Sequence, residues 1–174
     1  NALIYDYILS ADNPNSQIIK YLVNRGAKFE VHDEGYSGRT PMHFWARRNN
    51  YKLLELAIKG GANVDMQTRL IQESEYNETL LFEAVKEAET YRVTQLLIEL
   101  GANVNFITPT SPLDNAKGSR NKKLLKDAGA MTSAQLDKKY NIYWDSEECE
   151  KDESYMEKYC KLLNDAIKKA KENG

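Results

Sequence analysis

The sequence predicts an all-α protein in which about four helix–turn–helix units stack into a solenoid, followed by a C-terminal helical extension. Three observations predict this fold class. A Gly-Ala pair recurs at Gly26, Gly61, Gly101 and Gly129, with separations of 35, 40 and 28 residues. An amphipathic stretch precedes each pair, and a residue that commonly begins a helix lies further upstream. A period in the thirties is typical of stacked helical repeats.

The second helix of each unit is expected to end at the glycine. Apolar residues cluster before each glycine at three- and four-residue spacing, which predicts a helix with one buried face. Glycine then supplies the left-handed backbone conformation that other residues resist at a helix end. The clusters contain Ile18, Ile19, Tyr21, Leu22 and Val23; Leu53, Leu54, Leu56, Ala57 and Ile58; Val93, Leu96, Leu97, Ile98 and Leu100; and Leu124 and Leu125.

The first helix of each unit is expected to begin at a capping residue. Thr40, Thr79 and Ser111 each precede a helical pattern, and their hydroxyl groups can accept a bond from a free N–H group of the first turn. Pro41 and Pro112 follow directly, at the position where a missing N–H group is tolerated. Helices this short are not stable alone, so each unit must be stacked on its neighbours.

Short motifs recur in one register along these units. The sequence Thr-Pro-Met-His-Phe-Trp-Ala at residues 40–46 is echoed at 79–84 and 111–116, and Gly-Ala-Asn-Val-Asp at 61–65 is echoed at 101–105. The chain therefore resembles the ankyrin-repeat family, whose motifs are Thr-Pro-Leu-His-x-Ala and Gly-Ala-Asp/Asn-Val-Asn. The resemblance implies paired antiparallel helices in a curved stack, with links that project as turns or hairpin-like fingers. It also implies that His43 bonds backbone groups between units.

The resemblance covers residues 1–130, as units near 1–35, 36–74, 75–107 and 108–130. The first unit lacks the Thr-Pro pair and has a longer internal turn, which indicates either an N-terminal cap or a truncated array. The link of the second unit overruns the usual period between Met66 and Asn77. The helices of the fourth unit are short, as those of terminal units often are.

Residues 131–174 do not repeat and are expected to form a C-terminal helical cap with an acidic loop. Thr132 and Gln135 match a capping box, which predicts a short helix, and an apolar patch at 140–144 follows. The acidic segment at 145–153 is interpreted as a solvated turn, with calcium binding as the alternative. From Ser154, an amphipathic helix is expected to fold back on the exposed, hydrophobic end of the stack. The alternative is a helix that binds a groove on another protein.

Composition narrows the classes of function. A net charge of −2 and a pI near 5.8 argue against a general phosphate-backbone binder. No apolar run approaches the roughly 18 residues of a membrane span. From the charge we expect no nucleic acid as a partner, and from the lack of an apolar run we expect no membrane. Cys149 and Cys160 are expected to be free thiols, with pairing between them as the alternative. The cytoplasm is the expected compartment; secretion or a periplasmic location stays open because the chain begins with Asn1.

No motif for catalysis or cofactor binding is found in the sequence. It contains no glycine-rich phosphate loop, no His-Glu-x-x-His pair and no nucleophile elbow. His32, in the first link, is expected to be a solvated turn residue. We therefore expect a monomeric, non-enzymatic module that binds another protein without a cofactor or metal. The alternative is an accessory or targeting domain of a larger bacterial or viral effector or enzyme whose catalytic part lies outside this chain. The enrichment in Asn, Lys, Ile and Tyr suggests an AT-rich genome, which is consistent with a bacterial or viral source.

The partner site is expected on the concave surface formed by the links and the first helices, which the family resemblance implies as the usual contact face. Side chains there are not needed for stacking, and aromatic and arginine residues often dominate interface energies. A long ordered link is also more often functional than idle. The two aliphatic residues of the second link could instead pack under their own loop. The candidates are Tyr36, Arg39, Arg47, Arg48, Arg69, Leu70, Ile71, Tyr76 and Phe106.

Overall fold

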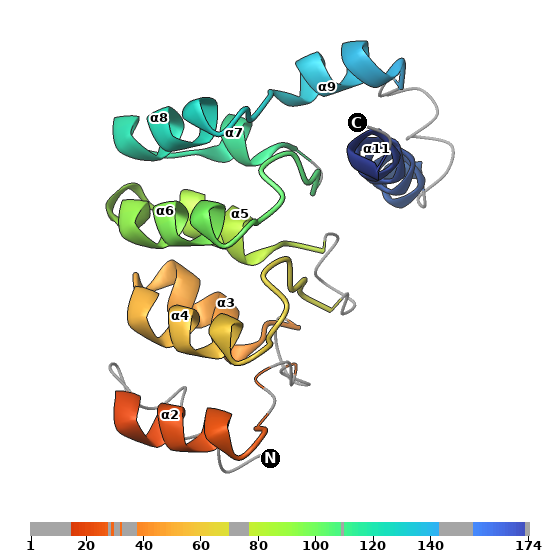
Figure 1. Ribbon diagram of the computed structural model, residues 1–174. Helices are drawn as coiled ribbons and strands as arrows, with labels where there is room; N and C mark the ends of the chain where they lie inside the picture. The colour runs from red at the N-terminus through yellow and green to blue at the C-terminus, as the bar shows by residue number, and fades with distance from the viewer. Residues whose placement is uncertain are drawn as a thin grey trace.

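The helices lie in pairs that stack along one axis (Figure 1). The computed structural model describes residues 15–27, 29, 32, 38–69, 77–108, 110–142 and 155–172. Within these ranges the predicted all-α fold class is confirmed, and strand-like pairing is limited to an isolated bridge between Gln67 and Thr79. The elements are α2 (Ser16–Asn24), α3 (Pro41–Arg47), α4 (Tyr51–Lys59), α5 (Leu80–Val85), the 3-10 helix η1 (Ala88–Thr90), α6 (Tyr91–Glu99), α7 (Pro112–Asn115), α8 (Ser119–Asp127), α9 (Ser133–Tyr140) and α11 (Tyr155–Glu172).

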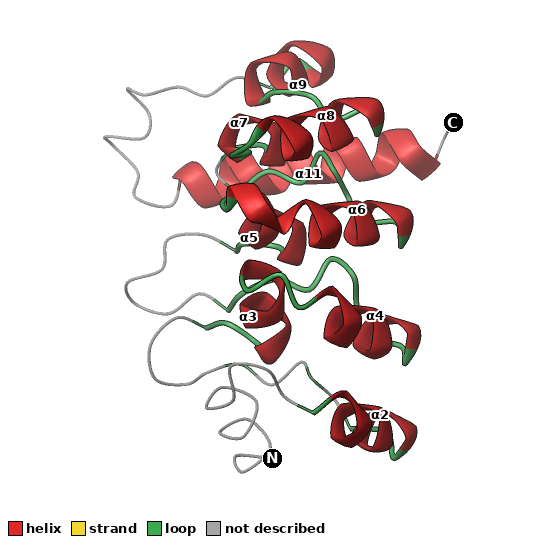
Figure 2. Cartoon of the chain, turned by 90° about the vertical axis from the view of Figure 1, so that its left-hand side faces the viewer, coloured by secondary structure: helices red, strands yellow, loops and turns green. Residues whose placement is uncertain are grey.

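The helices that begin the second, third and fourth units start at the expected capping residues, whereas the start of the first unit lies outside the described residues. The Thr79 hydroxyl accepts a hydrogen bond from the Phe82 N–H group at 3.2 Å, and the Ser111 hydroxyl accepts one from Asp114 N–H at 3.2 Å. We call α3, α5 and α7 the inner helices and α2, α4, α6 and α8 the outer helices. Figure 2 shows the inner helices in one column and the outer helices in another. The expected helix–turn–helix order is therefore present.

The main hydrophobic core runs along the stack, between the helix pairs. Ile19, Trp45 and Leu125 come from the first, second and fourth units, and Leu81 and Leu97 come from the third; each is at most 1% exposed. Each outer helix contacts the next outer helix, and each inner helix contacts the next inner helix. Complete burial of one such side chain stabilises the fold by roughly 1.5–3 kcal/mol. Every pair is therefore stabilised by the neighbours on which it stacks.

The outer helices show how the stack ends. Val23, three residues before Gly26, faces the next unit, because a Cβ atom on Gly60 would lie only 2.3 Å from its side chain. The equivalent residues of α4 and α6 are Ile58 and Ile98, which also pack against the core. In α8 this position is occupied by Lys126, which is exposed. The last outer helix thus presents a charged rather than an aliphatic surface at the end of the stack, as a capping repeat requires.

Two bridges of polar side chains connect successive links. The Asp65 carboxylate accepts a hydrogen bond from Asn103 N–H at 2.8 Å. One repeat later, the Asn105 side chain donates to Gly129 C=O at 3.3 Å and accepts from Met131 N–H at 2.8 Å. Asp65 and Asn105 both occupy the last position of the Gly-Ala-Asn-Val-Asp/Asn motif. Burial raises the pKa of Asp65 above its usual value. The hydrogen bond from Asn103 lowers this pKa and so offsets part of the increase.

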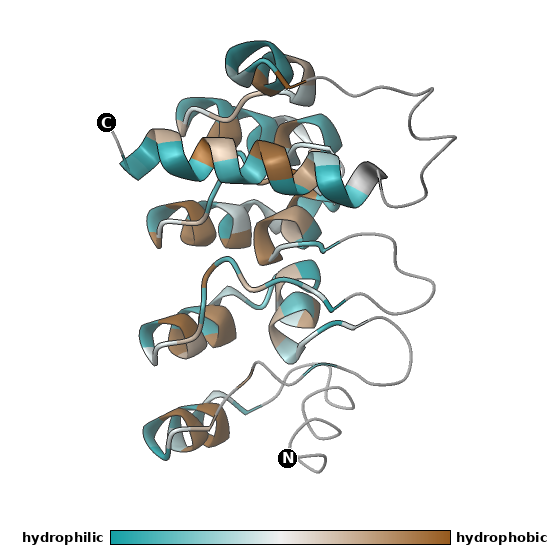
Figure 3. Cartoon of the chain, turned by 90° about the vertical axis from the view of Figure 1, so that its right-hand side faces the viewer, coloured by the Kyte–Doolittle hydropathy of each residue, from teal (hydrophilic) through white to brown (hydrophobic). Residues whose placement is uncertain are grey.

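The C-terminal helices were expected to cap the end of the stack, and the structure corrects that placement. The predicted capping box is present, because Thr132 N–H donates to the Gln135 side chain at 2.9 Å and Gln135 N–H donates to the Thr132 hydroxyl at 3.3 Å. Helix α11 then lies across the side of the stack from which the links project, beside α9 (Figures 1 and 3). Its apolar face packs on α9 and on the third link. The expectation failed because α8 ends the stack in lysines, which need no apolar cover.

The apolar surface that α11 covers forms a second, separate cluster. It consists of Ile107, Leu136, Tyr159, Leu163 and Ile167, each at most 5% exposed. Of the apolar patch expected at 140–144, Tyr140 and Ile142 pack against this cluster, whereas residues 143–144, the acidic segment and Cys149 lie outside the described residues.

The described residues at the bases of the links, which we call fingers, are held by main-chain hydrogen bonds. In the second finger, Thr68 N–H donates to Glu78 C=O at 2.9 Å, and Glu78 N–H donates to the Thr68 hydroxyl at 2.9 Å. These bonds lie beside the antiparallel bridge between Gln67 and Thr79 and join the two described ends of the second finger. The Arg69 N–H group also donates to Gly38 C=O at 2.8 Å, which ties the second finger to the first.

Gly38 is required where the two fingers meet. Its φ angle is +57°, and a Cβ atom at this position would lie 1.9 Å from the Arg69 carbonyl oxygen. The neighbour is main chain in a hydrogen-bonded finger, so it cannot move aside without breaking the contact. By contrast, Gly129 has a φ angle of +80° but has open space where a Cβ atom would lie.

We therefore expect Gly38→Ala to lower the free energy of unfolding by about 3 kcal/mol or more, through the backbone clash and the positive φ angle together. Gly129→Ala is the matched control and should lower it by about 1–2 kcal/mol, because it strains only the backbone dihedral. Urea denaturation of both variants measures the difference. Equal losses for the two variants would contradict the requirement for a close approach at Gly38.

Candidate partner-binding surface

His43 joins the second unit to the third at the base of the fingers. Its ring is fully buried, and its Nδ1 atom accepts a hydrogen bond from Thr40 N–H at 3.1 Å. The proton is therefore on Nε2, which donates to Glu78 C=O at 3.1 Å. Burial lowers the pKa of His43 to about 4, although the bond to Glu78 opposes this shift. The expected structural role of His43 is confirmed by these contacts.

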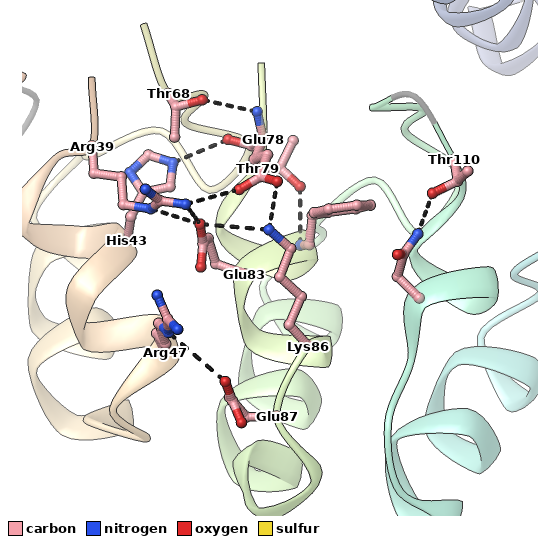
Figure 4. Close-up of polar contacts among 12 residues, drawn as sticks. Arg39, His43, Arg47, Thr68, Glu78, Thr79, Glu83, Lys86, Glu87 and Thr110 are labelled. Atoms are coloured by element: carbon pink, nitrogen blue, oxygen red, sulfur yellow. Dashed lines mark hydrogen bonds and ion pairs between the residues drawn. The ribbon is translucent and has the colours of Figure 1, made fainter. Parts of the chain in front are cut away.

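Next to His43, four charged side chains form a cluster between the second and third units (Figure 4). Arg39 binds Glu83 at 2.7 Å and Glu78 at 3.2 Å. Lys86 binds Glu78 on its other side and lies 3.9 Å from Glu83. Two cations and two carboxylates face each other, and the Glu83 side chain is only 1% exposed. The cluster is therefore a largely buried, charge-balanced contact between units.

The pKa values of the two carboxyl groups in this cluster are shifted in opposite directions. Burial raises the pKa of Glu78, and its hydrogen bond with Glu83 raises it further. Burial alone would also raise the pKa of Glu83, but the bond from Glu78 and the charges of Lys86 and Arg39 hold it below its usual value. Glu83 therefore loses its proton more readily than Glu78, and its buried charge is compensated by Arg39 and Lys86.

This cluster changes the interpretation of Arg39. Its guanidinium group was a candidate partner anchor, but here it holds two units together and its side chain is only 24% exposed. Breaking a buried ion pair leaves an uncompensated charge, which is strongly destabilising. Partner binding through Arg39 would therefore have to compete with a contact that the fold itself uses.

Arg47 and Arg48 lie at the other end of α3, about 10 Å from Arg39 along the helix axis. They line an open groove of about 530 Å³ between the second and third units, together with Phe44 on the same side and Glu87 and Glu89 on the other. The Arg47 side chain is 57% exposed and reaches Glu87 only at 3.8 Å (Figure 4). Such an exposed pair contributes little to stability, and Arg48 is exposed as well, so the main core depends on neither arginine.

The remaining described candidates are on the fingers. Arg69 is exposed at the base of the second finger, and Phe106 is half-buried in the third. The structure therefore divides the candidates into a finger group and a groove group at opposite ends of the inner helices. The candidates Tyr36, Leu70, Ile71 and Tyr76 lie outside the described residues.

Two residues near these sites differ in role from the sequence interpretation. Phe44 stands in the repeated motif at residues 40–46 and was not a candidate for binding, but it is half-buried and lines the groove. Its three- and four-residue spacing from Arg47 and Arg48 is the signal that could have identified it. His32 was expected to be a solvated turn residue, but it is half-buried and its Nδ1 atom lies 2.8 Å from the Gly38 carbonyl oxygen.

The described residues show no sign of a metal or membrane site. Within them, no three His, Cys, Asp or Glu side chains gather so that they could hold a metal ion. None of the described helices combines the length and the apolar character needed to cross a lipid bilayer.

Comparison with known proteins identifies the family. A family model of ankyrin repeats, in three copies, matches residues 7–108, and the chain belongs to this family. The crystal structure of the ankyrin repeat domain of Bcl-3, described as a unique member of the IkappaB protein family, has a TM-score of 0.52 and 25% sequence identity. The likeness covers 62% of this chain and 44% of that one, so this chain spans less than half of the Bcl-3 domain. No protein with a curated description matches the sequence.

The family sets the general class of function. Ankyrin repeats are protein–protein interaction modules and are typically non-catalytic. The match ends at residue 108, before α7 and α8 begin. Those two helices nevertheless stack on α5 and α6 in the same way as the earlier pairs.

The state of His43 predicts a pH dependence of stability. Between pH 6.5 and about 4 the unfolded state binds a proton on this residue and the folded state does not. Stability is therefore fully present above pH 6.5 and decreases as the pH falls toward 4, by up to roughly 3 kcal/mol for this group. The His43→Gln variant lacks this titrating group, so residue 43 no longer contributes to the pH dependence of its stability. Denaturation at pH 7 and pH 5 should show a smaller loss for the variant, and equal losses would contradict the assignment.

The ion cluster predicts a difference between two arginines on one helix. Arg39→Ala should lower the free energy of unfolding by roughly 2–4 kcal/mol, because it leaves buried Glu83 with only Lys86 for compensation. Arg47→Ala should lower it by about 0.5 kcal/mol or less, because its ion pair is exposed. Urea denaturation at neutral pH measures both. A loss at Arg47 as large as that at Arg39 would show that the groove pair, and not only the cluster, stabilises the stack.

Proposed function

We propose that the chain binds a protein partner through the surface formed by its fingers and inner helices, with Arg47 and Arg48 as the principal anchors. The observation that supports this is the groove at the end of α3, where both arginines are exposed beside Phe44. The long contact between Arg47 and Glu87 can be exchanged for a carboxylate of the partner without loss of a strong bond. An acidic side chain next to an apolar one on the partner would complement this groove.

The finger group forms the second part of the proposed surface. Arg69 is exposed and Phe106 is half-buried on neighbouring fingers, so they can contact the partner without disturbing the core. Arg39 lies between the two groups but is occupied by Glu78 and Glu83. We therefore assign Arg39 to the support of the surface rather than to direct recognition.

Affinity capture from a lysate of the source organism, with identification by mass spectrometry, tests the proposal. Arg47→Ala/Arg48→Ala should reduce recovery of the specific partner by about tenfold or more, because arginine anchors often contribute 1–2 kcal/mol or more each. Arg69→Ala/Phe106→Ala tests the finger group in the same way. Arg92→Ala, on the exposed surface of outer helix α6, is the matched control and should retain full recovery.

Thermal melting distinguishes lost binding from lost folding. Each double variant should melt within a few degrees of the wild-type chain, because the substituted residues lie outside the buried cores. Unchanged recovery with the Arg47→Ala/Arg48→Ala variant would move the principal anchors to the fingers. Unchanged recovery with both double variants would show that the partner does not use this surface.

A further inference from the structure

Helix α11 binds the main chain of the third finger through a side-chain amide, that of Asn164. The Ile107 N–H group donates to the Asn164 side-chain oxygen at 3.0 Å, and the Asn164 amide nitrogen donates to Ile107 C=O at 3.1 Å. A single side-chain amide thus satisfies both polar groups of one finger residue. Leu163 and Ile167 on the same helix pack on Ile107 and Leu136. The third finger and α9 together form a groove, which we call the finger–α9 groove, and α11 lies in it.

The stack does not depend on α11 for its main core. None of the buried residues that α11 covers belongs to the core cluster that runs between the helix pairs. The last outer helix ends in exposed lysines, and among the described core residues removal of α11 would uncover Ile107 and Leu136 of the second cluster. Stability in stacked repeats is a sum of local contacts between neighbours. The docked helix can therefore leave its groove while the units remain folded.

Helix α11 is held on one face only. Tyr159, Leu163 and Ile167 are spaced four residues apart and face the groove, each at most 5% exposed. The opposite face is in solvent, and Leu162 at its edge is 60% exposed. At the far end of the helix, Lys171 binds Asn103 at 2.9 Å through an exposed contact that contributes little. This is the geometry of an amphipathic helix bound in a surface groove.

We propose that the finger–α9 groove is a second interaction surface, which binds an amphipathic helix of a partner protein, and that α11 occupies it when the partner is absent. The groove selects an aromatic residue, Leu, Asn and Ile at positions i, i+4, i+5 and i+8, the pattern formed by Tyr159, Leu163, Asn164 and Ile167. The Asn is required because the Ile107 N–H and C=O groups lose water when the groove is filled. Because docked α11 blocks the groove, the apparent affinity for a partner helix equals the intrinsic affinity multiplied by the fraction of chains in which α11 is undocked.

A labelled synthetic peptide of residues 155–172 serves as the probe, and fluorescence anisotropy under reducing conditions measures its binding to the full chain. Leu163→Ala in the chain weakens its own α11, so the peptide should bind this variant about tenfold or more tightly than the wild-type chain. Leu162→Ala is the matched control, because Leu162 is exposed, and it should bind the peptide as the wild-type chain does. In the peptide, Leu163→Ala should abolish binding and Leu162→Ala should not.

The Cys160 thiol reports undocking independently. It is half-buried beside the second cluster, and burial raises its pKa to about 11, so it reacts slowly while α11 is docked. In a Cys149→Ser background, Leu163→Ala should increase its rate of alkylation about tenfold, whereas Leu162→Ala should not. Circular dichroism confirms that the helix pairs remain folded in each variant.

Three results would overturn the proposal. If alkylation is faster in the Leu163→Ala chain but the peptide does not bind it, the groove is not a site for an added helix. If neither alkylation nor peptide binding changes, α11 is a permanent part of the fold. If the Leu163→Ala chain does not bind the peptide and light scattering shows that this chain is dimeric, the groove is occupied by a second copy of the chain.

Discussion

The outer helices α4, α6 and α8 have nine residues each, and isolated helices of this length are marginal in water. Their stability therefore comes from being stacked between neighbours, and the other features of the structure follow from this constraint. Helices can approach closely only where side chains leave room, as Gly60 does against Val23. Each helix pair must also turn at its glycine so that the next pair lies in the same register. The repeating motifs record these local requirements.

Stacking brings polar backbone groups of successive units close together at the base of the fingers, where they are shielded from water. Such groups must find partners, because an unsatisfied buried donor or acceptor is strongly destabilising. His43, Asp65 and Asn105 supply these partners between neighbouring units. The Arg39–Glu83 ion pair likewise joins two neighbouring units, because each side chain compensates the charge of the other. These side chains are committed to the fold, and for this reason we propose that Arg47 and Arg48, which lie further from the buried bridges, take part in recognition.

The two ends of the stack are built differently. At the N-terminal end, α2 leaves Ile18 and Tyr21 with exposures of 42% and 57%. At the other end, Lys126 replaces the aliphatic residue that faces the next unit in earlier helices. The apolar surface near the C-terminus therefore lies on the third finger and α9, and α11 covers it there. A helix that covers the fingers limits the partner surface that we propose, whereas a helix that covered the end of the stack would not.

The sequence by itself determined the fold class, the helix boundaries near each cap and glycine, and the structural role of His43, because these depend on contacts within a unit or between adjacent units. It also identified exposed candidates such as Arg47 and Arg69. Only the tertiary structure decided that Arg39 is bound by Glu78 and Glu83, which are about forty residues away. It alone placed α11 on Ile107, 57 residues before Asn164. Periodicity shows which face of a helix is apolar but not which distant surface covers it, because that choice depends on where the whole stack leaves apolar area and unpaired backbone groups exposed.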